Sequence, residues 1–472
     1  MVKILENLID RAFALPHDWL ICDRNHLFTQ IAEQRYLELM EFSHKETPPK
    51  IFLAEDEPVR FLASFIAASA ARCQVFLCNP TWAKPEWQQV FDLGTPDIIW
   101  GIGEENTGIV PDKEDKKKTL LLPSSLSNFP LIMVPTGGSS GKIKFAIHTW
   151  ETLMASVRGF KEYFQIDRVH SFCVLPLYHV SGLMQFIRSF TTFGNLVILS
   201  FKELEAGQIY NINPSEFFIS LVPTQLQRFL KNPELTEWLS QFSTVLLGGA
   251  PAWNELLEQA RYHKIRLAPT YGMTETASQI ATLKPDDFLS GKDGCTRILP
   301  HVQVSIYNEK GISSNVNQIG NIRIYSQSLS LGYYPKIRVN QEYLQVDDLG
   351  FFDEQGYLHV SGRDSDKIIT GGENVYPLEV ESAIRETQMV TDICVIGVPD
   401  KVWGQAVTAI YIPKMPNLSP LTLKTLLKDK LSKFKVPKYW IGVDSLPRNS
   451  QGKVNRLLLQ QIAINSLEKN IL

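Results

Sequence analysis

A loop rich in small residues, TGGSSGKIK at positions 136–144, carries the residue types that hold a phosphate group. Glycines let the backbone turn its N–H groups toward an anion, hydroxyls add donors, and a lysine adds positive charge. We therefore predict that this loop binds a polyphosphate, with an ordinary surface turn as the alternative. The candidate phosphate-binding residues are Thr136, Gly137, Gly138, Ser139, Ser140, Gly141 and Lys144.

A Walker A loop is the rival phosphate-binding pattern and requires the order G-x-x-x-x-G-K-[ST]. Aligning Gly141 and Lys142 with its G-K pair places Thr136 where the first glycine belongs. The same alignment places Ile143 where a hydroxyl must hold Mg²⁺. The Walker pattern thus fails at two positions, and the sequence disfavours it.

Two further polar loops follow short apolar runs that are typical of buried strands. The run at 244–247 leads into Gly248, Gly249, Ala250 and Pro251, where a glycine pair lets a flat ring approach the backbone. The run at 265–268 leads into the loop YGMTET at 271–276, which includes Tyr271, Gly272, Thr274 and Glu275. We predict that the tyrosine covers an adenine, that the threonine donates to a phosphate, and that the glutamate supplies an oxygen for Mg²⁺.

In order along the chain, these loops resemble the motifs of the adenylate-forming superfamily, which includes acyl- and aryl-CoA synthetases, peptide-synthetase adenylation domains and luciferases. The resemblance implies that Asp348 and Arg363 hold the ribose hydroxyls of ATP, and a carboxylate offers the acceptors that a diol needs. The usual Thr-Gly-Asp reads Val346-Asp347-Asp348 here. Many relatives also carry an amide side chain where this chain has Pro269, so we expect backbone contacts to read the adenine.

The same resemblance covers the last quarter of the chain. The stretch TGGENVYP at 370–377 is similar to the loop that lines the pantetheine tunnel, and PRNSQGK at 447–453 to the motif that bears the adenylation lysine, Lys453. Rotation about a hinge at Ser365 would exchange this lysine for the tunnel loop between two half-reactions. The residues implied at the CoA channel are Gly371, Gly372, Trp403 and Lys435.

The reaction that the resemblance implies joins an acid to a thiol. A carboxylate oxygen attacks the α-phosphorus of ATP, pyrophosphate leaves, and the thiol of coenzyme A then displaces AMP. Positioned cations and donors carry most of such catalysis. The implied catalytic residues are Lys453, Glu275 and Thr274, with Mg²⁺ on Glu275, and the implied cofactors are ATP, Mg²⁺ and coenzyme A as co-substrate.

Two stretches bear on the identity of the acid. LPLYHVSGL at 175–183 and TETASQ at 274–279 resemble the 2-succinylbenzoate–CoA ligase branch, which serves menaquinone and phylloquinone synthesis. An aryl dicarboxylic acid needs an aromatic slot and donors for the carboxylate that is not activated. The candidates are His179, Ser181, Gly182, Ser278 and Gln279. Another aryl- or acyl-CoA ligase, a carrier-loading adenylation enzyme and a nucleotide-sensing relative without catalysis are the alternatives.

The elements that must position these residues alternate along the chain. From about residue 50, apolar runs of strand type alternate with amphipathic segments, which predicts an α/β fold with doubly wound, mostly parallel sheets. After about residue 285, strands and turns predict a β subdomain. We therefore predict an N-terminal AMP-binding domain at 1–362 with its β subdomain at about 285–362, a hinge at 363–366, and a small mobile α+β domain at 367–472.

The overall composition excludes several other classes of protein. Among 472 residues, 47 basic and 50 acidic side chains nearly balance, which argues against a nucleic-acid partner. The six cysteines form no CxxC pair, which is typical of reduced thiols rather than a metal site. From the sequence we expect neither a membrane span nor a signal peptide, because the apolar runs are short and acidic residues interrupt the first segment. We expect a cytoplasmic enzyme that acts on small molecules, and the sequence leaves its oligomeric state open, a homodimer included.

Overall fold

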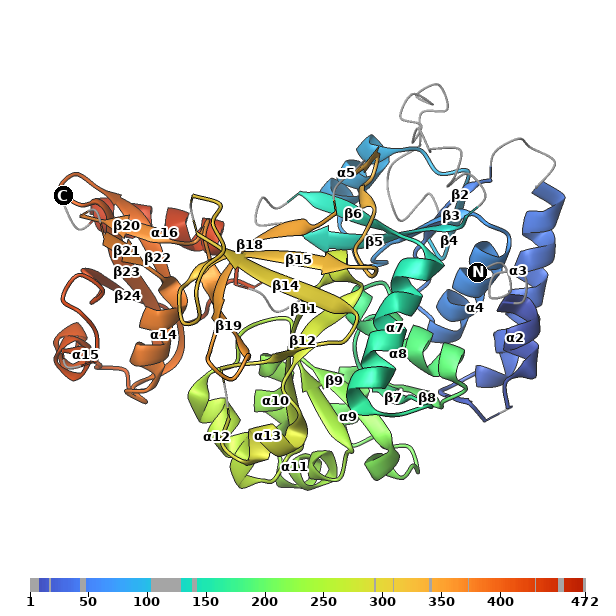
Figure 1. Cartoon of the computed structure of the whole chain (residues 1–472), viewed down its shortest axis with the longest axis horizontal. Coiled ribbons are helices and arrows are strands. Elements are labelled where there is room, and N and C mark those ends of the chain that lie inside the picture. Colours follow the sequence, from blue (N-terminus) through green and yellow to red (C-terminus); the bar gives the residue numbers. More distant parts are fainter. Residues whose placement is uncertain are drawn as a thin grey trace.

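Two mixed β-sheets form the core of the larger, N-terminal part of the chain, and a smaller C-terminal part follows residue 363 (Figure 1). The computed structural model describes residues 8–16, 18–42, 48–102, 129–137, 142–292, 294–308, 310–338, 342–371, 373–428, 430–448 and 454–469. Of the predicted site, Gly138, Ser139, Ser140, Gly141, Gly372 and Lys453 lie outside these residues.

The first sheet has eight strands, of which the first six in spatial order are parallel and the last two antiparallel. Parallel strands end at a common edge, so the loops that follow β10 and β11 lie side by side. In spatial order the strands are β1 (Leu20–Ile21), β8 (Leu196–Ile198), β7 (His170–Cys173), β9 (Phe217–Leu221), β10 (Thr244–Leu247), β11 (Leu267–Met273), β12 (Ser278–Thr282) and β13 (Arg297–Ile298).

The second sheet has seven strands, parallel at one end and antiparallel at the other. Its antiparallel pair, β5 and β6, contains the described ends of the predicted phosphate loop. In spatial order the strands are β17 (Lys336–Ile337), β16 (Gly332–Tyr333), β6 (Ile143–His148), β5 (Leu131–Gly137), β3 (Gln74–Leu77), β2 (Lys50–Leu53) and β4 (Ile98–Trp100).

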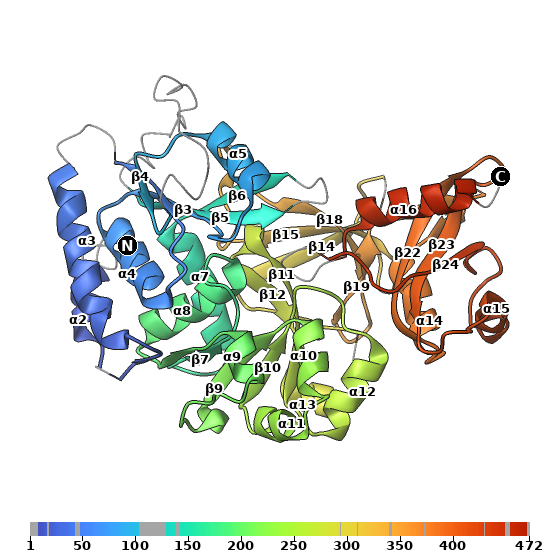
Figure 2. The same cartoon turned by 180° about the vertical axis from the view of Figure 1, so that it is seen from behind.

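Helices pack between and outside these sheets. One buried cluster joins side chains of β2, β3 and β7 to α4, α7 and α8, which places these three helices between the two sheets (Figures 1 and 2). The helices are α2 (Leu8–Ala14), α3 (Phe28–Phe42), α4 (Pro58–Ala70), α5 (Lys84–Leu93), α7 (Trp150–Phe164), α8 (Val180–Thr192), α9 (Phe201–Glu205), α10 (Pro223–Phe229), α11 (Pro233–Ser240), α12 (Asn254–Tyr262) and α13 (Pro285–Leu289).

A four-stranded antiparallel sheet connects the large part to the small one. Its strands are β14 (Val302–Tyr307), β15 (Gly320–Ser326), β18 (Leu344–Phe352) and β19 (Leu358–Arg363). The short strands β16 and β17 fall between β15 and β18 in the sequence, yet they belong to the second sheet: β16 pairs with β6, and β17 pairs with β16. This change of sheet places Tyr333 of β16 beside Ala146 of β6, the strand that contains Lys144.

The C-terminal part is a three-layer α+β unit built around β22 (Val390–Asp400). Alternate residues of β22 face two clusters: Ile393 and Val395 pack with α14 (Pro377–Arg385) and α15 (Pro420–Leu427), and Cys394 and Ile396 pack with α16 (Arg456–Lys469). Figure 2 shows α16 and α15 on opposite sides of this sheet. Its other strands are β20 (Ile368–Thr370), β21 (Glu373–Val375), β23 (Gly404–Pro413) and β24 (Tyr439–Gly442).

The structure confirms the predicted α/β class with a large N-terminal and a small α+β C-terminal part. The expectation of mostly parallel sheets is confirmed for the six strands from β1 to β11 in the first sheet and for β5, β3, β2 and β4 in the second. The pairs β5–β6 and β11–β12 are antiparallel. All six cysteines are free, and five are buried. In the part of the chain that the structure describes, no helix combines the length and apolar character needed to cross a bilayer.

Candidate active site

The described ends of the predicted phosphate loop lie on the paired strands β5 and β6. Thr136 pairs with Lys144 and Gly137 with Ile143, so the hairpin register fixes both ends of the loop. Lys144 is exposed, and its Nζ lies 5.4 Å from the centroid of the Tyr333 ring. The two flanks of the loop thus hold a hydroxyl and a cation opposite each other, as a phosphate cradle requires.

The structure brings together three residues that the sequence assigned to the nucleoside. The Tyr271 hydroxyl donates to Asp348 Oδ2 at 2.7 Å, and Arg363 Nε lies 3.4 Å from Asp348 Oδ1. The β18–β19 register places Asp348 directly opposite Arg363. Burial and the Asp348 charge raise the pKa of Tyr271, so the phenol keeps its proton. Both oxygens of the Asp348 carboxylate therefore have a partner, and their remaining lone pairs can accept hydrogen bonds from a diol.

The glycine-containing loop after β10 lies beside this group. Gly249 has a φ of +82°, and Ala250 and Pro251 are exposed. A Cβ on Gly248 would lie 2.5 Å from Thr270 Oγ1, on the strand that leads to Tyr271. Glycine at 248 therefore allows the two loops to approach, and the loop remains open to a flat ring.

Glu275 lies in the short 3₁₀ turn η3 (Thr274–Thr276) with only 9% of its side chain exposed. Its Oε1 accepts a hydrogen bond of 2.5 Å from the Tyr333 hydroxyl. Within the described residues, no lysine or arginine forms an ion pair with it, and no three His, Cys, Asp or Glu side chains cluster. A single carboxylate supplemented by phosphate oxygens suits Mg²⁺, which binds through one or two carboxylates plus substrate phosphates.

His148, which the sequence did not single out, supports this turn from β6. Its Nε2 lies 2.8 Å from the Thr274 carbonyl oxygen and its Nδ1 2.9 Å from Thr152 Oγ1. Burial lowers the pKa of His148 to about 4, so the ring is neutral near pH 7. The Ser156 hydroxyl also donates to the Ala277 carbonyl at 2.7 Å. Side chains of β6 and α7 thus hold the backbone around Glu275.

Arg188, on α8, is a second residue that the sequence analysis missed. Its side chain is 2% exposed, its Cζ lies 4.1 Å from the centroid of the Phe160 ring, and burial lowers its pKa to about 9. Its Nη2 donates to Ser278 Oγ at 3.3 Å and to Gln279 Oε1 at 3.1 Å. In the described part of the chain, no carboxylate pairs with this guanidinium and its Nε has no acceptor. An arginine within the apolar run at 182–190 was the available sequence signal.

Two residues near Arg188, His301 and Gln185, also carry buried polar atoms without partners among the described residues. Neither ring nitrogen of His301 has a partner among the described residues, and the same holds for Gln185 Oε1. A Cβ on Gly159 would lie 1.8 Å from His301 Nδ1, so glycine there admits the imidazole. Burial, with Arg188 second, lowers the pKa of His301 to about 4. These buried polar atoms near α7 and α8 could form hydrogen bonds with a polar ligand.

The predicted acyl residues separate into two groups along α8. Ser278 and Gln279 contact Arg188, whereas His179 and Ser181 lie at the start of the helix, with Ser181 about 10 Å from Arg188 along its axis. Gly182 packs against the backbone of Pro176, because a Cβ at position 182 would lie 2.2 Å from the Pro176 carbonyl oxygen.

Among the predicted coenzyme A residues, Gly371 and Trp403 are brought together. The Gly371 N–H donates to the Trp403 carbonyl at 2.9 Å, and Trp403 is 48% exposed. Lys435 instead forms an ion pair of 2.6 Å with Glu379. At the predicted hinge, the Ser365 N–H donates to Asp347 Oδ1 at 3.2 Å. Asp347 stands where the usual Thr-Gly-Asp motif has glycine, so this substitution adds a contact to the hinge between the N-terminal and C-terminal parts.

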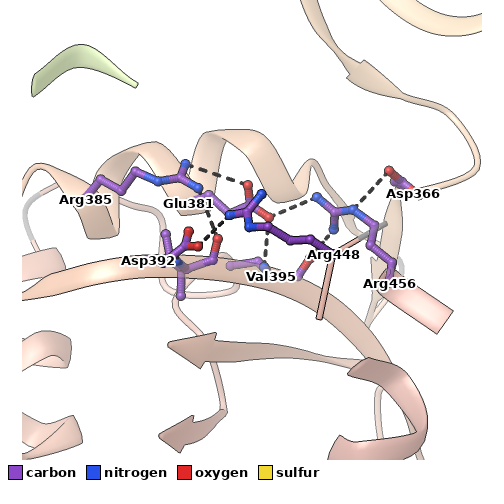
Figure 3. A network of polar contacts seen from close by, with 8 residues as sticks. Asp366, Glu381, Arg385, Asp392, Val395, Arg448 and Arg456 are labelled. Atoms are coloured by element: carbon purple, nitrogen blue, oxygen red, sulfur yellow. Dashed lines mark hydrogen bonds and ion pairs between the residues drawn. The ribbon is translucent and has the colours of Figure 1, made fainter. Parts of the chain in front are cut away.

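A polar network fixes the chain on both sides of the segment that contains Lys453 (Figure 3). Arg456 donates to the Val395 carbonyl at 2.6 Å and to Glu381 Oε1 at 2.9 Å, and its Nε lies 3.4 Å from Asp366 Oδ2. Arg448 donates to Asp392 Oδ2 at 2.5 Å. Residues 448 and 454 also form an antiparallel bridge. The ends of this segment are therefore anchored to the C-terminal sheet and to the residue after Ser365.

Comparison with known proteins agrees with this geometry. Residues 48–334 match the family model "AMP-binding enzyme", and residues 379–453 match "AMP-binding enzyme C-terminal domain". A 2-succinylbenzoate–CoA ligase of Oceanobacillus iheyensis is 32% identical over 364 residues, covering 75% of this chain and 72% of the relative. One of Listeria monocytogenes is 32% identical over 396 residues, covering 80% and 79%.

Solved structures extend the match over nearly the whole chain. The o-succinylbenzoate–CoA synthetase of Bacillus subtilis in complex with its acyl-adenylate intermediate has a TM-score of 0.79 at 25% identity, covering 96% of this chain and 98% of that one. The same enzyme with ATP and magnesium ion gives a TM-score of 0.78 at 25% identity, covering 96% and 99%. The family match, the relatives and the grouping of Tyr271, Asp348 and Arg363 agree: the chain belongs to the AMP-binding enzyme family.

Proposed function

We propose that this chain is an AMP-forming acid–CoA ligase that converts 2-succinylbenzoate, ATP and coenzyme A into 2-succinylbenzoyl-CoA, AMP and pyrophosphate, a step of menaquinone or phylloquinone synthesis. Relatives that carry the ligase name support the reaction. The observation that carries the choice of acid is Arg188, a buried guanidinium for which the described residues provide no carboxylate.

A dicarboxylic acid explains why such a cation is present. When one carboxylate is activated, the other stays charged, and a buried arginine without a counter-ion is costly to a protein. An anionic substrate group would offset this cost through charge-assisted hydrogen bonds. Ser278 and Gln279 lie on the strand directly after the turn of Thr274 and Glu275, so a single segment links the arginine to the phosphate end.

In the first half-reaction, the chain's own residues bind and orient the nucleotide. Asp348 and Arg363 hold the ribose, Tyr271 covers the adenine, and Lys453 neutralises charge on the α-phosphate. Bound at Glu275, Mg²⁺ would supply positive charge to the phosphate oxygens. The substrate acid is already ionised at neutral pH, so no general base is needed. The β- and γ-phosphates are held by Thr136, Gly137, Gly138, Ser139, Ser140, Gly141 and Lys144.

In the second half-reaction, the C-terminal part supplies the path for the thiol. Rotation about Ser365 removes Lys453 and brings Gly372 toward the adenylate, while Gly371, Trp403 and Lys435 contact coenzyme A. Lys435 must give up its ion pair with Glu379 to do so, which costs little because exposed pairs contribute about 0–1 kcal/mol. We infer that the enzyme acts on these small molecules in the cytoplasm.

ATP–pyrophosphate exchange across a panel of acids tests this function. The panel contains 2-succinylbenzoate, the two analogues that each keep one of its carboxylates (4-oxo-4-phenylbutanoate and 2-butanoylbenzoate), benzoate and a fatty acid. We expect exchange to be fastest with 2-succinylbenzoate. Exchange with benzoate or the fatty acid but none with 2-succinylbenzoate would overturn the choice of acid. Transfer to a carrier-bound pantetheine arm but not to coenzyme A would instead indicate a carrier-loading enzyme.

A further inference from the structure

Tyr333, on β16, touches both halves of the phosphate and magnesium site. Its hydroxyl donates to Glu275 Oε1 at 2.5 Å, and Lys144 Nζ lies 5.4 Å from the centroid of its ring. The glutamate comes from the first sheet and the lysine from the second. A single side chain therefore connects the proposed metal ligand to the proposed phosphate lysine.

The backbone holds Tyr333 firmly against the strand of Lys144. Tyr333 pairs with Ala146 of β6, and the flanking residues bond to the same strand: the Leu331 N–H donates to Ile147 at 2.8 Å and the Tyr334 N–H to Phe145 at 2.9 Å. Three consecutive contacts leave the tyrosine little freedom to move relative to the phosphate hairpin. The pairing of β16 with β6 therefore determines the position of Tyr333.

Only one of the two carboxylate oxygens of Glu275 accepts a hydrogen bond from the described residues. Glu275 is nearly buried, and its backbone carbonyl accepts from the Ser330 N–H at 2.8 Å. Among the described residues, Tyr333 provides the only hydrogen bond to the side chain, and that bond goes to Oε1. Oε2 is thus left to accept a cation, and hydrogen bonds of this kind orient metal-binding carboxylates.

We propose that Tyr333 is a positioning residue of the phosphate–magnesium site: its hydroxyl orients Glu275 so that Oε2 binds the cation, and its ring keeps the Lys144 ammonium beside the phosphates. Arg338, whose Cζ lies 5.8 Å from the same ring centroid, adds a second cation there. The proposal rests on the proposed function only for the presence of ATP and Mg²⁺, and it holds whichever acid is activated.

Manganese affinity of the enzyme–ATP complex, measured by electron paramagnetic resonance without any acid, tests the role of the hydroxyl. Tyr333→Phe keeps the ring and removes the hydrogen bond, so we expect roughly tenfold weaker Mn²⁺ binding. ATP affinity in excess chelator should stay within about twofold, because the ring over Lys144 remains. Tyr334→Phe makes the same chemical change one residue away, on a ring that packs against Phe76, and should leave Mn²⁺ affinity unaltered.

Two further variants separate positioning from a general loss of structure. Tyr333→Leu also removes the ring, so ATP affinity in chelator should fall about threefold. In a Glu275→Gln background, Tyr333→Phe should add no further loss of Mn²⁺ affinity, because the group that it orients is gone. Unchanged or tighter Mn²⁺ binding by Tyr333→Phe, or additive losses in the double variant, would overturn the proposal. Failure of the acid panel with these binding results intact would refute the choice of acid and leave the role of Tyr333 standing.

Discussion

Replacing Arg188 with methionine should strongly weaken recognition of a second carboxylate while leaving adenylation chemistry intact. Methionine retains much of the side-chain volume between α7, α8 and β12 and removes the charge and the hydrogen bonds to Ser278 and Gln279. Loss of one partner of a buried charge pair costs about 2–5 kcal/mol. At 1.4 kcal/mol per factor of ten, kcat/KM for 2-succinylbenzoate should fall roughly 30- to 4,000-fold.

The same substitution should not destabilise the free protein. Arg188 is buried without a carboxylate among the described residues, and a buried charge without a counter-ion carries a desolvation cost that methionine removes. The Tm of the free variant should therefore equal or exceed that of the wild type, whereas 2-succinylbenzoate should no longer raise it. A loss of function without a loss of stability separates ligand recognition from misfolding.

Pyrophosphate release measures this effect. It is compared for 2-succinylbenzoate and for whichever of the two one-carboxylate analogues supports exchange in the acid panel. We expect a large loss with the dicarboxylate and less than about a threefold change with the analogue, which has no second carboxylate to lose. Arg158→Met is the matched control, because Arg158 lies exposed on α7 with one hydrogen bond of 3.5 Å to Gln327. Equal losses with both acids, or a clear drop in the Tm of the free variant, would refute the reasoning.

Three further predictions address the two half-reactions and the turn at Glu275. Lys453→Ala should abolish acyl-adenylate formation and spare thioester formation from supplied acyl-adenylate, both followed by chromatography. Gly371→Val should slow the thioester step more than ATP–pyrophosphate exchange, because the φ is +59° and a Cβ would lie 2.7 Å from the Trp403 ring. Burial lowers the pKa of His148 to about 4, so its contribution to stability is present above about pH 6.5 and lost as the pH falls toward 4. Thermal unfolding of His148→Gln should be less sensitive to acid over that window.

Each of these predictions has a contradicting result. Equal loss of both half-reactions in Lys453→Ala would contradict the proposal that this lysine acts only in the adenylation step. Unimpaired thioester formation in Gly371→Val would argue against a thiol path beside Trp403. For His148, a wild type and a glutamine variant with the same loss of Tm between pH 6.5 and 5 would show that the ring does not titrate on unfolding.

Features set by local residue types could be predicted from the sequence. Glycine, serine and lysine in the loop at 136–144 predict a phosphate cradle, because backbone freedom and charge are properties of the residues themselves. This assignment stays a prediction, since residues 138–141 lie outside the described part of the chain. The alternation of apolar runs indicated the α/β class. The sequence motifs also placed Asp348 and Arg363 in one site, and the β18–β19 register does bring them together.

Features that depend on distant partners could not be predicted. Arg188 resembles any helical arginine until β12 places Ser278 and Gln279 beside it. Tyr333 acquires its role only because β16 leaves its own sheet to pair with β6, and no local pattern announces that excursion. His148 follows the same rule, since its partner Thr274 lies in the turn between β11 and β12 of the other sheet. Propensity and periodicity describe single elements, whereas these contacts arise from the packing of two sheets.

The route of the substrate oxygen tests the central claim most directly. With 2-succinylbenzoate labelled with heavy oxygen in both carboxylates, attack on the α-phosphorus must leave one labelled oxygen in AMP once coenzyme A has taken the acyl group. We predict that mass spectrometry will find that label in AMP, none in pyrophosphate, and a 2-succinylbenzoyl-CoA thioester in equal amount. Unlabelled AMP, or label in pyrophosphate or inorganic phosphate, would contradict an acyl-adenylate intermediate.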